Sequence, residues 1–180
     1  LGHGVRTQRP AHGRRRLPRQ ARHLGDPAID AGADRRFDLE KSETFHTIVK
    51  TLIDKFGKID ILINNGGLSQ RANARDTTLE VDRRIMEVNY FGNIALTKTV
   101  LPYMQKQKSG NIVVISSIAG KFGFFLRSAY SASKHALHGF YESLRMEEEE
   151  NGIRVLIICP GKIATNISVN ALAGDGTGHN

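Results

Sequence analysis

The sequence predicts an α/β domain built on a parallel β-sheet, and three observations support this prediction. Short runs rich in isoleucine and valine alternate with longer segments in which apolar residues recur at helical spacing. The short runs are almost continuously apolar, as expected of parallel strands covered on both faces. Polar and glycine-containing motifs follow these runs, at the strand ends where parallel sheets bind their ligands.

The helices and strands can be assigned in order from this periodicity. Ser42 is a suitable N-cap for the first helix, and Gly57 is placed to end it. The alternation of helices and strands predicts that right-handed crossovers connect parallel strands. The expected elements are helix Glu43–Phe56, strand Ile59–Ile63, helix Leu79–Gln105, strand Asn111–Ser116, helix Ala129–Glu149 and strand Ile153–Cys159.

The charge is unevenly distributed and divides the chain into two parts. The net charge is +8, from 26 basic and 18 acidic residues. Residues 1–36 hold nine arginines and three aspartates, which leaves 17 basic and 15 acidic residues for the remainder. We therefore expect a basic, disordered or aberrant segment at 1–36 and a partial domain at 37–180. Because the basicity belongs to one end, nucleic-acid binding is a hypothesis for that arm and is not expected of the fold.

Length and composition set further limits. A chain of 180 residues is long enough for one domain with its own core. No apolar run approaches the roughly 18 residues that span a bilayer, and the first residues do not resemble a signal peptide. Cys159 is the only cysteine, so an intramolecular disulfide is impossible, and we expect its side chain to point into a buried strand. These features predict a cytoplasmic protein without a membrane span.

Tyr130 and Lys134 carry the most informative chemistry. They are four residues apart on an expected helix, so they share one face. A phenol has a pKa near 10, and an adjacent ammonium group lowers that pKa toward neutrality. Ser117 follows a strand and can donate a hydrogen bond to a substrate carbonyl oxygen. The three side chains therefore predict proton transfer to or from an oxygen, although a tyrosine and lysine at this spacing alone also fit a solvated helix face.

Three further motifs follow in an informative order. Asn64-Asn65-Gly66-Gly67 follows one expected strand, and Asn89 lies within the second helical pattern. Cys159-Pro160-Gly161-Lys162-Ile163-Ala164-Thr165 follows the last expected strand. Because the carboxyl ends of parallel strands share one edge, the strand-end motifs should meet Ser117 in a single crevice.

This series of motifs resembles the short-chain dehydrogenase/reductase family from about Phe37 to about Ala173. The resemblance implies a Rossmann-type, doubly wound parallel sheet and NAD(P)-dependent oxidoreductase activity. The segment Asn64–Arg71, with Gly66 where most members have alanine, is similar to the branch of dehydrogenase/reductase member 7. Animal members of that branch are linked to bulky apolar carbonyl compounds.

The family resemblance implies a role for each motif residue. Catalysis would use Asn89, which holds a proton-relaying water, Ser117, which orients the carbonyl, Tyr130 as acid or base, and Lys134. Lys134 would also hold the ribose hydroxyls of the nicotinamide half. The cofactor-binding residues implied are Asp38 at the adenine, Asn65, Gly66 and Gly67 at the adenosine ribose, Tyr130, Lys134, Pro160, Gly161, Ile163 and Thr165. Plain structural readings stay open for Asp38 as a surface acid, Asn89 as a helix-kinking residue and Gly66 with Gly67 as a turn.

The chain departs from the family pattern at both ends. Residues 1–36 contain no recognisable strand and no Gly-rich phosphate-binding turn, and Gly2 and Gly4 lack the required spacing. The stretch Ala173–Asn180 stands where family members have a substrate-covering helix pair. We therefore expect the N-terminal βαβ unit and the C-terminal lid to be missing or damaged.

These observations lead to one main functional hypothesis and one alternative. The main hypothesis is an NAD(P)-dependent oxidoreductase that interconverts a carbonyl and an alcohol, with a slight preference for NADP over NAD. Its substrate is expected to be a small molecule that is bulky and apolar, and the two long helices are expected to mediate a homo-oligomer. The alternative is a non-catalytic fragment that lacks a competent cofactor site. No metal site is expected, since His135 and His138 lack a third ligand.

Overall fold

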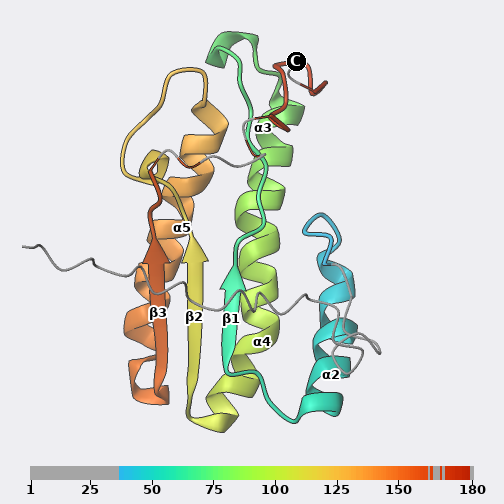
Figure 1. Ribbon diagram of the computed structural model, residues 1–180, viewed down its shortest axis with the longest axis vertical. Coiled ribbons are helices and arrows are strands. Elements are labelled where there is room, and N and C mark those ends of the chain that lie inside the picture. Colours follow the sequence, from blue (N-terminus) through green and yellow to red (C-terminus); the bar gives the residue numbers. More distant parts are fainter. Residues whose placement is uncertain (1–36, 162, 164–166, 168, 179–180) are drawn as a thin grey trace, which may run out of the picture. The chain divides into compact units, whose positions relative to one another are not determined.

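The computed structural model describes residues 37–161, 163, 167 and 169–178. The basic segment at 1–36 lies outside these residues. The described part contains a three-stranded parallel sheet in the order β1-β2-β3, with β1 at Ile61–Asn64, β2 at Gly110–Ile115 and β3 at Ile153–Ile158 (Figure 1). The parallel α/β fold predicted from the sequence is confirmed, and each strand begins or ends within two residues of its expected limits.

Helices connect the strands as crossovers. Three long α-helices are α2 at Phe45–Phe56, α4 at Asn93–Gln107 and α5 at Ser128–Glu147. A shorter helix, α3 at Leu79–Met86, continues into α4 through the π-helical segment η3 at Glu87–Gly92. Short 3₁₀ turns complete the set: η1 at Ser42–Thr44, η2 at Ala74–Asp76, η4 at Ile118–Gly120 and η5 at Glu149–Asn151.

The first helix differs from its expected start and agrees with its expected end. Ser42 does not cap α2, because it begins the 3₁₀ turn η1, and Thr44 occupies the N-cap position of α2 without a side-chain cap. Gly57 ends α2 with φ +78°, and its N–H donates to the carbonyl of Ile53. A left-handed residue at this position is the common way to close a helix.

The core lies between one face of the sheet and the helices α4 and α5, which both run along the strands in Figure 1. Side chains alternate across a strand, so Ile112 and Val114 both face this core and are fully buried. Leu137 and Tyr141 of α5 contribute from the opposite side. Helix α2 packs against α4, and its Phe45 joins the same core.

The other face of the sheet does not match the sequence expectation. Ile61 and Ile63 of β1 are 57 and 60% exposed, and Leu156 of β3 is 56% exposed. We expected both faces of these apolar strands to be covered. Among the residues that the structure describes, α4 and α5 cover one face and leave the second face open.

The π-helical segment η3 is stabilised by an asparagine that follows it. A π-turn widens the helix, so its carbonyls are not all met by the usual i→i−4 hydrogen bonds. The Asn93 amide donates to the carbonyls of Asn89 and Val88, at 2.9 and 3.1 Å. Asn93 is 2% exposed, so this side chain supplies buried donors where the backbone pattern changes.

Candidate active site

A cavity of about 660 Å³ lies at the carboxyl edge of the sheet. Its walls come from the ends of β1, β2 and β3, from the start of α5 and from the segment that follows β3. Eight of the residues that the sequence singled out line this cavity: Asn65, Gly67, Ser117, Tyr130, Lys134, Pro160, Gly161 and Ile163. The motifs therefore meet in one crevice, as the parallel topology predicted.

Lys134 lies on α5 with its side chain only 4% exposed. Its ammonium donates a hydrogen bond of 2.9 Å to the carbonyl of Ile115, the last residue of β2. Burial lowers the pKa of Lys134 to about 8, because the charged form loses solvation. The lysine is thus fixed at the strand end, and its charge responds to pH in the mildly alkaline range.

Tyr130 lies one turn before Lys134 and is 9% exposed. The Lys134 ammonium lies 5.7 Å from the centre of the tyrosine ring, and the Arg127 guanidinium lies 5.9 Å from it. Two cationic groups therefore flank this ring. The Tyr130 backbone N–H donates to the side chain of Gln70 at 3.2 Å, which fixes the start of α5 against the loop after β1.

Ser117 follows β2 and caps the short turn η4. Its hydroxyl oxygen accepts a hydrogen bond of 3.1 Å from the N–H of Ala119. Because the oxygen accepts this bond, the hydroxyl proton can be donated to a ligand in the cavity. The neighbouring Ser116 is 4% exposed and contacts His138 instead, at 3.0 Å.

Asn89 is fully buried within the π-helical segment. Its amide group donates to the carbonyl of Leu68 at 2.8 Å and to Ser133 at 2.9 Å. Its carbonyl oxygen accepts from the N–H of Leu68 at 2.7 Å. This side chain therefore fixes the loop that lines the cavity, and its expected role in a water relay stays a prediction.

Gly66 and Gly67 are both in tight surroundings. A Cβ atom at Gly66 would lie 2.5 Å from the Cδ1 of Leu39, and Gly66 itself is not part of the cavity wall. A Cβ atom at Gly67 would lie 3.1 Å from the Asn89 carbonyl oxygen and 3.8 Å from the Lys134 ammonium. The Gly66 position thus has a packing reason for glycine, whereas Gly67 keeps the backbone close to the lysine.

Three of the predicted cofactor residues differ in how they relate to the cavity. Asp38 is exposed, accepts a hydrogen bond from the N–H of Glu40 and pairs with Lys41 at 3.8 Å, and it does not line the cavity. Pro160 lines it, and its carbonyl accepts from the N–H of Ile118 at 3.1 Å. Thr165 lies outside the described residues.

Sequence reasoning missed two polar residues at this site. Gln70 is fully buried and joins its loop to the start of α5, because its amide donates to Ser128 at 3.1 Å while its carbonyl accepts from the N–H of Tyr130. Arg127 lines the cavity and donates to the hydroxyl of Ser69. Arg127 could have been found from its spacing of three residues before Tyr130, whereas no periodic signal distinguishes Gln70 from its loop.

The described residues provide neither a metal site nor a membrane-spanning helix. No group of three or more histidine, cysteine, aspartate or glutamate side chains in this part of the chain could hold a metal ion. His135 contacts the carbonyl of Ser131, whereas His138 contacts Ser116, so the two histidines face different partners. Within the same residues, no helix is both long and apolar enough to cross a bilayer.

Comparison with known proteins supports the interpretation of these motifs. The family model for short chain dehydrogenase matches residues 17–175, a range that starts inside the basic segment at 1–36. Dehydrogenase/reductase SDR family member 7B from Mus musculus is 51% identical over 141 residues, which cover 78% of this chain and 44% of that protein. This chain therefore spans about half the length of the curated relatives it matches.

Similarity to solved structures supports the same family. A short-chain dehydrogenase from Streptomyces avermitilis superposes with a TM-score of 0.72 at 35% identity, over 82% of this chain and 56% of its own. NAD⁺-bound xylitol dehydrogenase superposes with a TM-score of 0.67 at 32% identity, over 69% and 48% of the two chains. ElxO with NADP bound superposes with a TM-score of 0.70 at 30% identity, over 73% of this chain and 54% of its own. With the family model matching most of its length and the parallel sheet shared with these structures, the chain belongs to the short chain dehydrogenase family, in the branch of dehydrogenase/reductase member 7.

Proposed function

We propose that this protein interconverts a carbonyl compound and an alcohol with a nicotinamide cofactor, and that Tyr130 transfers the proton. The observation that carries the proposal is the convergence of Ser117, Tyr130 and Lys134 on one cavity of about 660 Å³. A hydroxyl donor, a phenol and a buried ammonium together can stabilise the negative charge that forms on a carbonyl oxygen and can supply a proton to it.

Each side chain has a distinct role in this reaction. Ser117 donates its hydroxyl proton to the substrate carbonyl oxygen and so orients the carbonyl. In reduction, Tyr130 donates its phenolic proton to that oxygen, and in oxidation it accepts the proton. Lys134 and Arg127 flank the ring and stabilise the negative charge that remains on the phenol oxygen. The bound cofactor supplies or accepts the hydride.

The residues around Lys134 fit the nicotinamide half of such a cofactor. In this proposal Gly67 lies at the nicotinamide ribose and not at the adenosine ribose that the family resemblance implied, because the absence of a Cβ leaves its backbone close to the Lys134 ammonium. Asn65, Pro160, Gly161 and Ile163 supply the remaining cofactor contacts in this proposal. From the family resemblance alone, we assign Asp38 and Gly66 to the adenosine half of the cofactor and Thr165 to its carboxamide.

The cavity wall favours an apolar substrate. Ile115, Ile118, Ala119 and Phe124 supply aliphatic and aromatic surface next to Ser117. Phe122, which is not part of the cavity wall, stacks on Phe124 with ring centres 5.7 Å apart, and both residues are exposed. We therefore propose a bulky, apolar carbonyl substrate, with NADPH as the preferred reductant. The expected homo-oligomer through the two long helical regions stays a prediction.

A direct test is titration of the protein with NADPH and NADH, followed by nicotinamide fluorescence. Saturable binding, followed by reduction of an apolar ketone or aldehyde, would support the proposal. Tyr130→Phe is the matched variant, because it removes the reacting hydroxyl and keeps the ring. It should retain binding while turnover falls by at least about 100-fold.

The alternative hypothesis predicts a different result in the same assay. If the folded chain binds neither nucleotide at millimolar concentration, it is a non-catalytic fragment that retains only the proton-transfer side chains. If Tyr130→Phe turns over as fast as the unmodified protein, Tyr130 is not the acid, whatever the affinity for the cofactor.

A further inference from the structure

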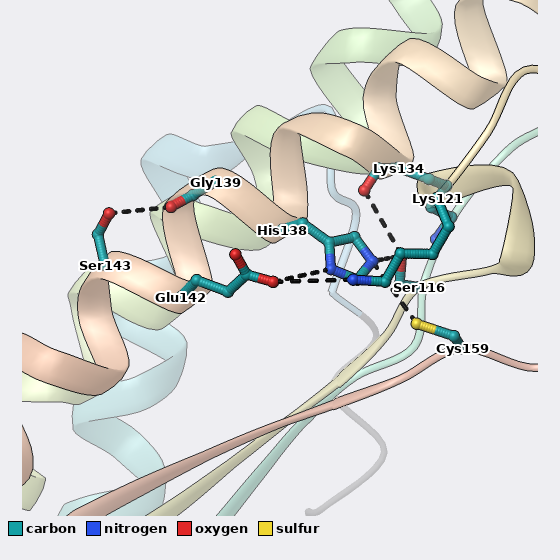
Figure 2. A network of polar contacts seen from close by, with 8 residues as sticks. All are labelled: Ser116, Lys121, Lys134, His138, Gly139, Glu142, Ser143 and Cys159. Atoms are coloured by element: carbon teal, nitrogen blue, oxygen red, sulfur yellow. Dashed lines mark hydrogen bonds and ion pairs between the residues drawn. The ribbon is translucent and has the colours of Figure 1, made fainter.

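A second group of reactive side chains adjoins the cavity, which Ser116 also lines, and has no role in the proposed reaction. Figure 2 shows His138 of α5 near its centre, with Ser116, just after β2, and Cys159, just after β3, on one side of the imidazole and Glu142 on the other. The Nε2 of His138 lies 3.0 Å from the Ser116 hydroxyl and 3.6 Å from the Cys159 sulfur. The Nδ1 of the same ring lies 3.3 Å from a carboxylate oxygen of Glu142.

The contacts of the imidazole determine which nitrogen can act as a base. A carboxylate cannot donate a hydrogen bond, so its contact with Nδ1 favours a proton on Nδ1. In this tautomer of the neutral ring, Nε2 carries the lone pair and faces the thiol of Cys159 (Figure 2). A nucleophile, a base within hydrogen-bond reach and a third group that orients the base form the arrangement found at activated nucleophiles.

Two possible nucleophiles share this base, and the thiol is the better one. Ser116 is 4% exposed, and its hydroxyl also lies 3.5 Å from the carbonyl of Lys134, so its proton has a second acceptor. Cys159 is partly exposed, so a reagent can reach it more easily. Sulfur is also intrinsically the stronger nucleophile near neutral pH.

We propose that Cys159 is a covalent modification site for α,β-unsaturated aldehydes and ketones, activated by His138. The sulfur forms a bond to the β-carbon of the reagent, while the thiol proton moves to Nε2 of His138. The electrons of the carbon–carbon π bond shift to the α-carbon and the carbonyl, and the resulting enolate then takes a proton at the α-carbon from His138. The sum is an addition with no leaving group and no oxidant or reductant, and His138 returns to its starting form.

The composition of the chain rules out one oxidation product of this thiol, an intramolecular disulfide. Cys159 is the only cysteine, so no second thiol of this chain can resolve an oxidised sulfur as a disulfide. Cys159 also lies next to the cavity wall in the sequence. Cys159 is followed directly by Pro160, which lines the cavity and whose carbonyl holds the N–H of Ile118.

The test measures the rate of adduct formation with methyl vinyl ketone by intact-protein mass spectrometry. The reference is the same chain unfolded in urea at the same pH. If His138 acts as a base, Cys159 should react at least about 10-fold faster in the folded chain than in the unfolded chain. Cys159→Ser identifies any adduct that forms on lysine or histidine.

Three variants separate activation by His138 from simple exposure of the thiol. His138→Gln should lose the rate advantage, because the amide cannot accept the thiol proton. Glu142→Gln should lower the rate about threefold or more, and it is a safe change because the Glu142 side chain is 52% exposed. His135→Gln is the matched control, since His135 lies on the same helix but contacts Ser131, and its rate should stay within about twofold.

The proposal is overturned if the folded chain reacts no faster than the unfolded chain. It is also overturned if Glu142→Gln and His138→Gln both keep the unmodified rate. Circular dichroism of each variant shows whether the fold is retained, and Glu142→Gln decides the question if His138→Gln does not fold.

Discussion

The charge of Lys134 should make the stability of this protein depend on pH in the alkaline range. Its side chain is 4% exposed, and burial lowers its pKa from 10.5 to about 8. Below pH 8 the lysine is charged in both the folded and the unfolded state, so the fold bears the full cost of the buried charge. Between pH 8 and 10.5 the folded state loses its proton first, so the unfolded state binds more protons and the free energy of unfolding rises with pH.

The size of this effect follows from the pKa difference. Each pKa unit corresponds to about 1.4 kcal/mol, so the pKa shift of Lys134 corresponds to roughly 3 kcal/mol. Lys134→Met removes the charge and also the hydrogen bond to Ile115, which costs about 1 kcal/mol at every pH. The variant should therefore be more stable than the unmodified protein by about 2 kcal/mol at pH 7, and this advantage should disappear and reverse as the pH approaches 10.5.

Urea unfolding followed by circular dichroism, at pH values from 7 to 10.5, measures this difference directly. Taking the variant and the unmodified protein at the same pH cancels the titration of the groups they share. Lys106→Met, at an exposed position of α4, is the control and should give a difference that does not change with pH. A Lys134→Met difference that stays constant over this range would refute the argument.

Three further substitutions test the packing around the site. Gly92→Ala should lower the free energy of unfolding by about 2–3 kcal/mol, because its Cβ would overlap the backbone carbonyl of Leu39. Gly139→Ala, with open space at its Cβ on α5, should instead raise the free energy of unfolding by up to about 1 kcal/mol. Equal urea midpoints for these two variants would contradict this prediction. Asn89→Ala should cost about 2 kcal/mol, since the N–H and carbonyl of Leu68 lose their partner, and thermal unfolding measures that cost.

Sequence patterns predicted the architecture well because parallel strands and amphipathic helices leave local signals. The strand expected at Ile59–Ile63 is found at Ile61–Asn64, and the helix expected to end at Gly57 does so. The pattern over Leu79–Gln105 did not reveal its π-helical segment. Apolar residues still recur near helical spacing through η3, and the buried amide of Asn93 that supports the wider turn leaves no periodic signal.

The candidate site was partly predictable for the same reason. Tyr130 and Lys134 are close in sequence, so their shared helix face could be inferred, and the strand ends had to meet at one edge. Gln70 was not predictable, because its position depends on how the loop after β1 folds back against α5.

The surroundings of Cys159 and the second face of the sheet were also beyond the local pattern. We expected Cys159 to point into a buried strand, but it follows β3 and lies against His138. Ile61 and Leu156 carry the apolar pattern of strands covered on both sides, yet they are more than half exposed among the described residues. An apolar sequence indicates what a residue can pack against, whereas burial depends on which segments are present to cover it.

The register of the parallel sheet also has a consequence for how this fold forms in time. Ile61 pairs with Asn111, and Gly110 pairs with Ile153, so each pairing closes a long loop and no hairpin can start the sheet. Loop closure must come before the contacts that compensate for it, which makes such topologies slow to fold. Strand β2 takes part in both pairings, so we expect that neither β1 nor β3 can join the sheet before β2 is in place. Substitutions in β2 should slow folding, whereas substitutions at the outer strands should mainly speed unfolding.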